Sequence, residues 1–324
     1  MSDQTIRYLS RSDVASVGVT MSEIIEGLEK AFREHSEGRV EAPPKPGVHT
    51  RPDAFIHAMP AYIPALHAVG IKWVSGYPEN LKHGLPYITG LLILNDEDTG
   101  VPLAVMDCTW ITAMRTGAAT ALAAKYLARS DSETVGILGC GTQGRSNLEA
   151  LKVFFPLKHV IAYDVASAQV DRFAADVEEW WGLPVTKARH PREAVDGCDL
   201  VVTAGPILRT PHATIKAGWL KKGGFASLVD FDSYWDAAAM QESDKFCTDD
   251  IPQLEHYRQA GYFRNIPPIY ATIGDLVAGK RPGREHPQER TMTCNLGLAL
   301  EDMATASTVY RRAVARGIGT VLPL

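Results

Sequence analysis

Three glycines at fixed spacing limit the fold of this chain more than any other feature of its sequence. In the segment VGILGCGTQGRSNLEALK, Gly139, Gly141 and Gly144 form G-x-G-x-x-G between a short apolar run and a helical stretch. The first glycine permits a tight turn, the second lets the backbone approach a diphosphate, and the third lets helix and strand pack closely. The N–H groups at the positive end of the helix then hold the diphosphate. The segment therefore predicts a dinucleotide-binding turn that also includes Thr142 and Gln143.

An acidic residue at the end of the next apolar run strengthens this prediction. Asp164 closes VIAYD, 25 residues after Gly139, near the separation of about 20 residues at which a carboxylate accepts hydrogen bonds from an adenosine ribose. The same carboxylate repels a ribose 2'-phosphate, and the following VASAQ offers no Arg or Lys to receive one. NAD(H) is therefore favoured over NADP(H). The alternative role for Asp164 is a helix N-cap or a solvated strand end.

Alternating apolar runs and helical stretches surround this turn. From VGIL onward the order is strand, helix, strand, helix, which indicates a parallel sheet covered by helices, a Rossmann-type doubly wound α/β domain. The third strand of this pattern ends in Thr203, Ala204 and Gly205, whose small side chains let a nucleotide lie over the strand ends.

The first third of the chain has a different periodicity. Between residues 54 and 94 short apolar runs alternate with turns, which is typical of an antiparallel sheet. The amphipathic stretch GLALEDMATASTVYRRAVARG near the carboxyl end is expected to return to this part. We therefore expect a mixed α+β domain over residues 1–118, completed by residues 298–324, and a Rossmann domain over residues 119–297.

Charge and cysteine content exclude several classes of protein. Thirty-eight acidic and 33 basic side chains give a net charge of −5, without the basic excess of a protein that binds nucleic acid. No apolar run approaches the roughly 18 residues that span a bilayer, and MSDQTIRYLSRSD has no signal-peptide layout, so we expect a cytoplasmic protein. The five cysteines are scattered and form no metal-type pair, which argues against a disulfide framework and a metal centre.

Several longer motifs carry a resemblance that runs nearly from end to end. Through MPAYI, GIKWVSGYPEN, LNDEDTGVPLAVMD, ITAMRTGAATALAAKYLA, GILGCGTQG and NLGLALEDMATA, the chain resembles the ornithine cyclodeaminase and mu-crystallin family. The resemblance implies a substrate-binding and dimerisation domain, an inserted Rossmann domain and a homodimer. It also implies hydride exchange between a nicotinamide and the α-carbon of a small amino or imino acid.

Two cations are the candidates for binding the substrate carboxylate. By motif, the resemblance assigns this role to Arg115 in AMRTG and Lys72 in GIKWV, and it assigns Thr116 to the cofactor. The chemistry agrees, because a guanidinium fork matches a carboxylate and two cations fix the α-carbon for hydride transfer. A desolvated lysine near a second cation can also exchange protons. Two plainer roles stay open: an ion pair between Arg115 and an acid across the domain boundary, and a solvent-facing Lys72.

The segment LVDFDSYWD contains the candidate acid. Asp232 matches the family's acid at the end of a Rossmann strand, where it would steady a protonated imine nitrogen or deliver its proton. Asp230 stands where the resemblance leads us to expect a small residue, often glycine. Either carboxylate can be the functional one, and the motif favours Asp232.

Three further residues bear on the substrate. Lys45 in PPKPG replaces an arginine of the cyclodeaminases, and Tyr87 in GLPYITG replaces a small threonine thought to contact their substrate. The basic loop that contains Lys45 and His57 would receive the distal carboxylate of a small diacid imine such as iminosuccinate, reduced to aspartate, or it is an ordinary solvated loop.

These residues leave three functions open. The first is an NAD(H)-dependent imino-acid reductase or amino-acid dehydrogenase. The second is an ornithine cyclodeaminase, a lyase that reduces and reoxidises tightly held NAD within one cycle. The third is a mu-crystallin-like protein that holds a nicotinamide and a small ligand without turnover. The joint presence of Lys72, Arg115 and Asp232 favours an enzyme.

Overall fold

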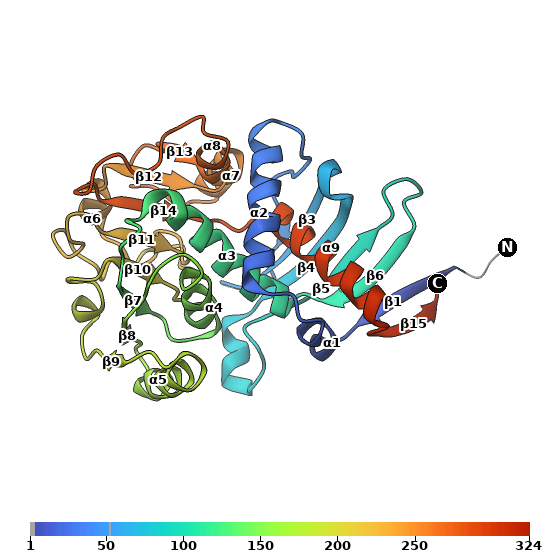
Figure 1. Ribbon diagram of the computed structural model, residues 1–324, viewed down its shortest axis with the longest axis horizontal. Helices are drawn as coiled ribbons and strands as arrows, with labels where there is room; N and C mark the ends of the chain where they lie inside the picture. The colour runs from blue at the N-terminus through green and yellow to red at the C-terminus, as the bar shows by residue number, and fades with distance from the viewer. Residues whose placement is uncertain (1–3, 52) are drawn as a thin grey trace. The chain divides into compact units, whose positions relative to one another are not determined.

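The computed structural model of the chain describes residues 4–51 and 53–324, and it divides into two units (Figure 1). The first unit comprises Met1–Arg115 and Gly297–Leu324, and the second comprises Thr116–Leu296. The corresponding sequence-based limits are 118/119 and 297/298. Residues 1–3 and Pro52, which fall within the expected first domain, lie outside the described residues.

The second unit is built on an eight-stranded sheet in which every pairing is parallel. Apolar runs such as LVVT and FASL are buried along their whole length, as expected where helices cover both faces of a parallel sheet. In Figure 1 the strands follow one another in the order β13-β12-β14-β11-β10-β7-β8-β9. Their bounds are β7 (Thr134–Leu138), β8 (His159–Tyr163), β9 (Val185–Lys187), β10 (Leu200–Thr203), β11 (Phe225–Leu228), β12 (Lys245–Thr248), β13 (Ala271–Thr272) and β14 (Thr291–Cys294).

The order of these strands reverses at β7. The chain runs from β7 to β8 and β9, and then returns to β10 on the other side of β7. Such a switch point leaves a crevice at the carboxyl ends of the two central strands, where doubly wound sheets bind their ligands. The helices between the strands are α4 (Thr142–Leu151), α5 (Ser167–Trp181), α6 (Ala237–Gln241), α7 (Ile251–Gln259) and α8 (Ile273–Val277), and α3 (Thr109–Leu127) contains the first boundary between the units.

The first unit contains a mixed seven-stranded sheet of order β15-β1-β6-β5-β4-β3-β2. All its pairings are antiparallel except that of β1 with β6. This sheet and the parallel sheet confirm the α/β fold class expected from the sequence. The strands are β1 (Thr5–Leu9), β2 (Gly47–Val48), β3 (Phe55–Ile63), β4 (Ala68–Gly76), β5 (Ile88–Asn95), β6 (Pro102–Asp107) and β15 (Thr320–Pro323), and the helices are α1 (Arg11–Ser16), α2 (Met21–Ser36) and α9 (Ala299–Arg316).

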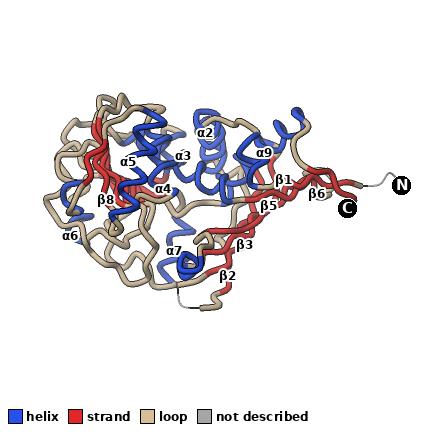
Figure 2. The backbone as a smooth tube through the Cα atoms, turned by 90° about the horizontal axis from the view of Figure 1, so that it is seen from below, coloured by secondary structure: helices blue, strands red, loops and turns tan. Residues whose placement is uncertain are grey.

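One face of this sheet is covered and the other is open. Helix α9 packs on β3 and β4, and α2 packs on α9, so that Figure 2 shows both helices on the same side of the strands. Because side chains alternate along a strand, Lys72 points to the covered face with Met59 and Leu92, its neighbours on β3 and β5. Trp73 and Leu91, which are paired across β4 and β5, point the other way and are 50% and 46% exposed.

Candidate active site

The glycine turn between β7 and α4 combines two close backbone contacts with one open position. Gly139 has φ +104°, and a Cβ there would lie 2.5 Å from the carbonyl oxygen of Ala204. A Cβ on Gly144 would lie 2.4 Å from the carbonyl oxygen of Gly139, so α4 approaches the turn only with glycine at this position. A Cβ on Gly141 would meet no atom of the described residues within 4 Å. Packing within the chain explains the outer glycines, whereas Gly141 borders open space.

Helix α4 presents its N-terminus at this turn. Its N-cap is Gly141, and no side chain in the described part of the chain caps it. The backbone N–H groups of its first turn, which begins with Thr142 and Gln143, are therefore available to an anionic ligand at the positive end of the helix. An uncapped helix N-terminus beside open space fits the diphosphate of a dinucleotide.

Helix α3 packs closely against α4 in the second unit. Thr116 is the first residue of that unit, and a Cβ on the following Gly117 would lie 2.3 Å from the carbonyl oxygen of Ser146 on α4. Only a glycine allows helices to approach so closely. This contact holds Thr116 near the helix that presents its N-terminus to the turn.

Asp164 follows directly after β8 and is bonded to the glycine turn. Its Oδ2 accepts a hydrogen bond of 2.8 Å from the N–H of Cys140, and its Oδ1 accepts one of 3.0 Å from the N–H of Ala166. The N-cap of α5 is Ala166, so Asp164 is not that helix cap. The carboxylate thus stands beside the turn, at the strand end where an acid would meet a ribose.

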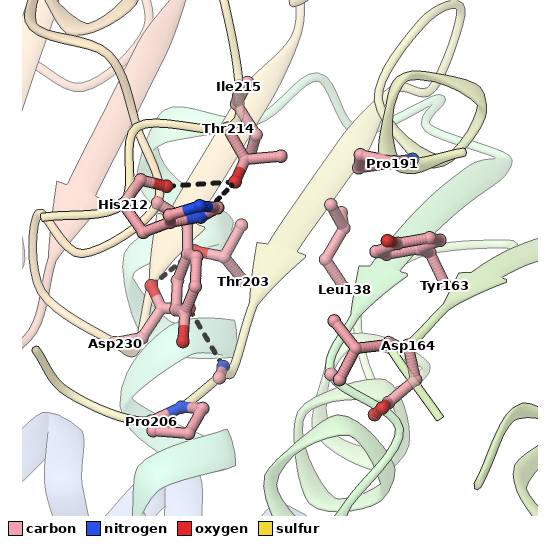
Figure 3. Close-up of a pocket in the computed structure, with 14 residues that line it drawn as sticks. Leu138, Tyr163, Asp164, Pro191, Thr203, Pro206, His212, Thr214, Ile215 and Asp230 are labelled. Carbon is pink, nitrogen blue, oxygen red and sulfur yellow. Dashed lines mark hydrogen bonds between the residues drawn. The ribbon is translucent and has the colours of Figure 1, made fainter. Parts of the chain in front are cut away.

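A cavity of about 220 Å³ lies over the ends of β7, β8 and β10. Its position matches the switch point of the sheet, and Thr203 and Gly205 line it as the sequence predicts, while Ala204 contacts Gly139 through its backbone. The residues that follow β10 add lining groups that sequence reasoning missed, because their only signal is that they come after a strand end. In Figure 3, Tyr163, Asp164 and Pro191 stand on one side of the cavity and Thr203, His212 and Thr214 on the other, with Leu138 between them.

Two carboxylates follow β11, and they have different surroundings. Asp230 accepts hydrogen bonds from the hydroxyl of Thr203 at 2.6 Å and from the N–H of Gly205 at 2.9 Å, and burial raises its pKa to about 7. Asp232 is also buried, which raises its pKa, but its Oδ1 has no hydrogen-bond partner among the described residues. Phe231 between them has φ +63°, an uncommon value for a bulky residue. Asp230 fixes the end of β10, whereas Asp232 retains an unsatisfied acceptor.

A cluster of buried charges lies on the covered face of the first sheet. Lys72 and Arg115 are 1% and 7% exposed, and both meet acids from the first turn of α9. Nζ of Lys72 lies 2.6 Å from Oδ2 of Asp302, in a buried ion pair. Arg115 donates from Nε to Oδ1 of Asp302 at 3.1 Å and from Nη1 to Glu301 at 2.8 Å. The solvent-facing position that the sequence left open for Lys72 is therefore wrong. The ion pairs of Arg115 with Glu301 and Asp302 lie within the first unit rather than across the domain boundary.

Lys45 joins this cluster through the backbone at the second boundary of the units. Its buried ammonium donates a hydrogen bond of 2.9 Å to the carbonyl oxygen of Gly297. Gly297 has φ +74°, and a Cβ there would lie 2.5 Å from Nη1 of Arg115. The structure therefore brings Lys45, Lys72 and Arg115 together, from segments far apart in the sequence.

The two remaining predicted substrate residues lie in different parts of the first unit. His57 shares the covered face with Lys72, because it pairs with Val74 while Lys72 pairs with Met59. The imidazole stacks on Phe55 with 4.3 Å between ring centroids. Tyr87 precedes β5, and its carbonyl oxygen accepts a hydrogen bond from the N–H of Tyr77. His57 is thus a diagonal neighbour of Lys72, whereas Tyr87 belongs to a turn at the end of the sheet.

Neither cysteine chemistry nor a metal centre is built into the described part of the chain. All five cysteines are free and buried, and burial raises the pKa of Cys108 to about 11 and that of Cys140 to about 12. No three His, Cys, Asp or Glu side chains of residues 4–51 and 53–324 gather as metal ligands. Within the same residues, no helix is long and apolar enough to cross a membrane.

Comparison with known proteins identifies the family. A family model described as the ornithine cyclodeaminase/mu-crystallin family matches residues 7–317. The chain belongs to this family. The family resemblance expected from the sequence motifs is thereby confirmed.

Similar members of the ornithine cyclodeaminase/mu-crystallin family include dehydrogenases and reductases. Alanine dehydrogenase of Archaeoglobus fulgidus is 35% identical over 324 residues, which cover 96% of each chain. The solved structure of Δ1-pyrroline-2-carboxylate reductase of Thermococcus litoralis, in complex with NADH and L-proline, has a TM-score of 0.89 and 34% identity over 97% of this chain and 99% of that one. An archaeal alanine dehydrogenase dimer with bound NAD has a TM-score of 0.88 and 33% identity over 98% and 99%. With its Rossmann unit, this family member is an NAD-dependent oxidoreductase.

Proposed function

We propose that the protein exchanges a hydride between NAD(H) and the α-carbon of a small amino or imino acid, with imine reduction as the direction that consumes NADH. The observation that carries the proposal is the buried cluster of Lys45, Lys72 and Arg115 in the first unit. Relatives support it, because alanine is the substrate named for one and L-proline is bound with NADH in another.

The charges of the cluster suit a single carboxylate. Lys72 and Arg115 are paired with Glu301 and Asp302, and Lys45 donates to the carbonyl oxygen of Gly297. Buried cations attract an anion more strongly than exposed ones do, so the carboxylate of an amino or imino acid suits this cluster. Arg115 contributes planar donors and the lysines contribute point charges, which together orient the carboxylate and its α-carbon.

Asp232 is the proposed proton donor. An imine accepts a hydride at carbon most readily when its nitrogen is protonated, because the positive charge makes the carbon more electrophilic. Burial raises the pKa of Asp232, the direction that favours the protonated carboxyl group of a proton donor. NADH, when bound, supplies the hydride. The proton of Asp232 goes to the imine nitrogen, the C=N bond becomes C–N, and an amino acid and NAD+ result.

The adenosine end of the cofactor is assigned to the cavity over β7, β8 and β10. Gly141 and the first turn of α4 would receive the diphosphate, and Asp164 would accept hydrogen bonds from the ribose hydroxyls. The carboxylate of Asp164 disfavours a 2'-phosphate, so NADH is the proposed partner rather than NADPH.

A panel of substrates tests the proposal. Pyruvate and other 2-oxo acids with ammonia or methylamine, cyclic imino acids and iminosuccinate are each incubated with NADH or NADPH, and absorbance of the reduced cofactor is followed. We expect net NADH consumption with at least one imino acid and slower consumption of NADPH. Conversion of ornithine with no net change in NADH would replace the proposal by the lyase, and saturable NADH binding without any turnover would replace it by the binding protein.

A matched pair of variants tests which carboxylate donates the proton. D232N and D230N each convert a buried acid of the same turn into an amide of the same shape. We expect D232N to lower kcat by about 10²–10⁴-fold, as removal of a general acid does, and D230N to leave kcat within several-fold. A larger loss in D230N than in D232N would reverse the assignment.

Iminosuccinate is a second candidate substrate. His57 favours it, because this imidazole shares the covered face with Lys72 as a diagonal neighbour, within reach of the distal carboxylate of a four-carbon diacid. The expected result is turnover of iminosuccinate that H57F lowers at least about tenfold while turnover of a monocarboxylic imine is retained. Equal turnover of the imine of pyruvate, unaffected by H57F, would exclude this candidate.

We also propose a homodimer formed through the open face of the first sheet. Trp73 and Leu91 are exposed side by side on that face, and the alanine dehydrogenase relative is a dimer. W73E is expected to yield monomers by light scattering. W180E is the matched control, because Trp180 is 52% exposed on α5 of the second unit, and its replacement should leave the dimer intact.

A further inference from the structure

The acids at the start of α9 stand out among the buried groups of the first unit. Glu301 and Asp302 are fully buried in the first turn, and Glu301 accepts a hydrogen bond of 3.1 Å from the N–H of Leu298, the N-cap residue. Two adjacent buried carboxylates are costly to the fold unless each has a partner. Their partners are the cations to which the proposed function assigns the substrate carboxylate.

We propose that Asp302 is a positioning residue that holds Lys72 as an ammonium ion and fixes it beside Arg115, whereas Glu301 acts on Arg115 alone. This inference rests on the proposed function. Asp302 bridges the two cations, with 2.6 Å from its Oδ2 to Nζ of Lys72 and 3.1 Å from its Oδ1 to Nε of Arg115. Glu301 meets Arg115 at 2.8 Å and otherwise bonds to the backbone of its own helix turn.

The environment of Lys72 explains why it needs this acid. Burial lowers the pKa of Lys72, and the nearby guanidinium of Arg115 lowers it further, whereas Asp302 raises it, together with a smaller effect of Cys108. The hydroxyl of Thr112 accepts a hydrogen bond of 3.4 Å from the ammonium but carries no charge. Asp302 therefore contributes most of what keeps Lys72 protonated, and a protonated Lys72 is what attracts a carboxylate.

The two acids differ in what their removal would do. Loss of the Asp302 charge would lower the pKa of Lys72 and leave its side chain without its ion-pair partner. Loss of the Glu301 charge would leave the ion pair between Lys72 and Asp302 in place and would remove only the ion pair between Arg115 and Glu301. A purely structural role predicts similar consequences for both variants, because the acids are adjacent, equally buried and on one helix turn.

The test compares D302N with E301Q in the full-length protein. Lysine labelled with ¹³C at the ε-carbon is followed by NMR against pH, and the signal of Lys72 is identified by its absence in K72R. We expect D302N to lower the titration midpoint of Lys72 by about 1–3 pH units, the effect of a lost opposite charge at this distance, and E301Q to leave it nearly unchanged. Equal midpoints in D302N and the wild type would overturn the inference.

Kinetics supply the second readout. With the substrate found by the panel, the alkaline limb of kcat/KM should move to lower pH in D302N and stay in place in E301Q, and KM should rise more than kcat falls. If D302N does not fold, D302E is the alternative, because it keeps the negative charge but displaces the carboxylate. A titration midpoint of Lys72 near that of the wild type together with a raised KM would support the inference. An unchanged KM would overturn it. The NMR titration needs no substrate, so a failed panel with a shifted midpoint would reject the proposed function alone.

Discussion

The two candidate binding regions are built from different parts of the chain. The dinucleotide region of the second unit is made from backbone: a turn shaped by Gly139 and Gly144, an uncapped helix N-terminus, and strand ends. The charged region of the first unit is made from side chains that converge from distant segments, with Lys72 and Arg115 held by the start of α9. A backbone site depends on local geometry, whereas a side-chain site depends on the whole tertiary fold. Substitutions should therefore act differently in the two regions.

The largest effect is expected from R115M in the side-chain region. This change removes the cation that pairs with Glu301 and one of the two cations beside Asp302, so the buried charge of Glu301 loses its ion pair. The free energy of unfolding should fall by about 3–5 kcal/mol, the cost of breaking a buried ion pair from one side, and turnover should be lost. Urea denaturation and the NADH assay measure the two effects. R39M is the control, since it removes an exposed cation and should change neither stability nor turnover. An R115M protein as stable as the wild type would contradict the proposed difference between the two regions.

A glycine pair tests the backbone region. In G141A the added Cβ meets open space, so the melting temperature should stay within a few degrees of the wild type while NADH binding weakens at least about tenfold, because the methyl group occupies the approach of the diphosphate. In G139A the Cβ meets the carbonyl oxygen of Ala204 at a positive φ, so stability should fall as well. Fluorescence titration of NADH and thermal melts provide the measurements. Unchanged NADH affinity in G141A would remove the diphosphate from this turn.

The same contrast explains what the sequence could reveal. The glycine turn and Asp164 lie within one strand-helix-strand segment, so spacing alone predicts their proximity, and Cys140 N–H bonds to Asp164 as that proximity requires. The fold class follows equally from local periodicity, because buried parallel strands are continuous apolar runs and half-buried strands alternate.

Only some residues of the side-chain region could be predicted from the sequence. Motifs indicated Lys72 and Arg115, but alternation along β4 left open which face Lys72 would take, and only the packing of α9 decides it. Glu301 and Asp302 carry no spacing signal that links them to Arg115, 186 and 187 positions earlier in the chain, or to Lys72. His212 in the cavity is likewise placed by the course of the segment after β10, which no short motif encodes.

A smaller effect is expected where the backbone region uses a single side chain. D164N keeps an acceptor for the N–H of Cys140 and removes the negative charge beside the ribose site. Preference for NADH over NADPH should fall by about 10–100-fold, because one charge-assisted hydrogen bond and one repulsion are lost together. The ratio of kcat/KM for the two cofactors measures it. D171N, at an exposed ion pair on α5, should leave the ratio unchanged, and a D164N protein that still discriminates as the wild type does would assign the preference elsewhere.

The smallest effect on activity, and the most specific on stability, is expected at Asp230. Its pKa of about 7 in the folded chain lies above the value near 4 of an unfolded aspartic acid. Between these values the folded chain holds a proton that the unfolded chain has lost, so the free energy of unfolding falls as pH rises through this window; the contribution is complete below about pH 4 and lost above about pH 7. D230N does not titrate, yet its amide can keep the contacts with Thr203 and Gly205. From about pH 5.5 to about 7.5 the free energy of unfolding of the wild type should fall by of order 1–2 kcal/mol relative to that of D230N, as measured by urea denaturation. D196N, a change at an exposed position, is the control and should show the same pH dependence as the wild type. If the free energies of unfolding of D230N and the wild type depended on pH in the same way, Asp230 would be ionised over the whole range. The carboxylate at the end of β10 would then be an anion that faces the cofactor cavity.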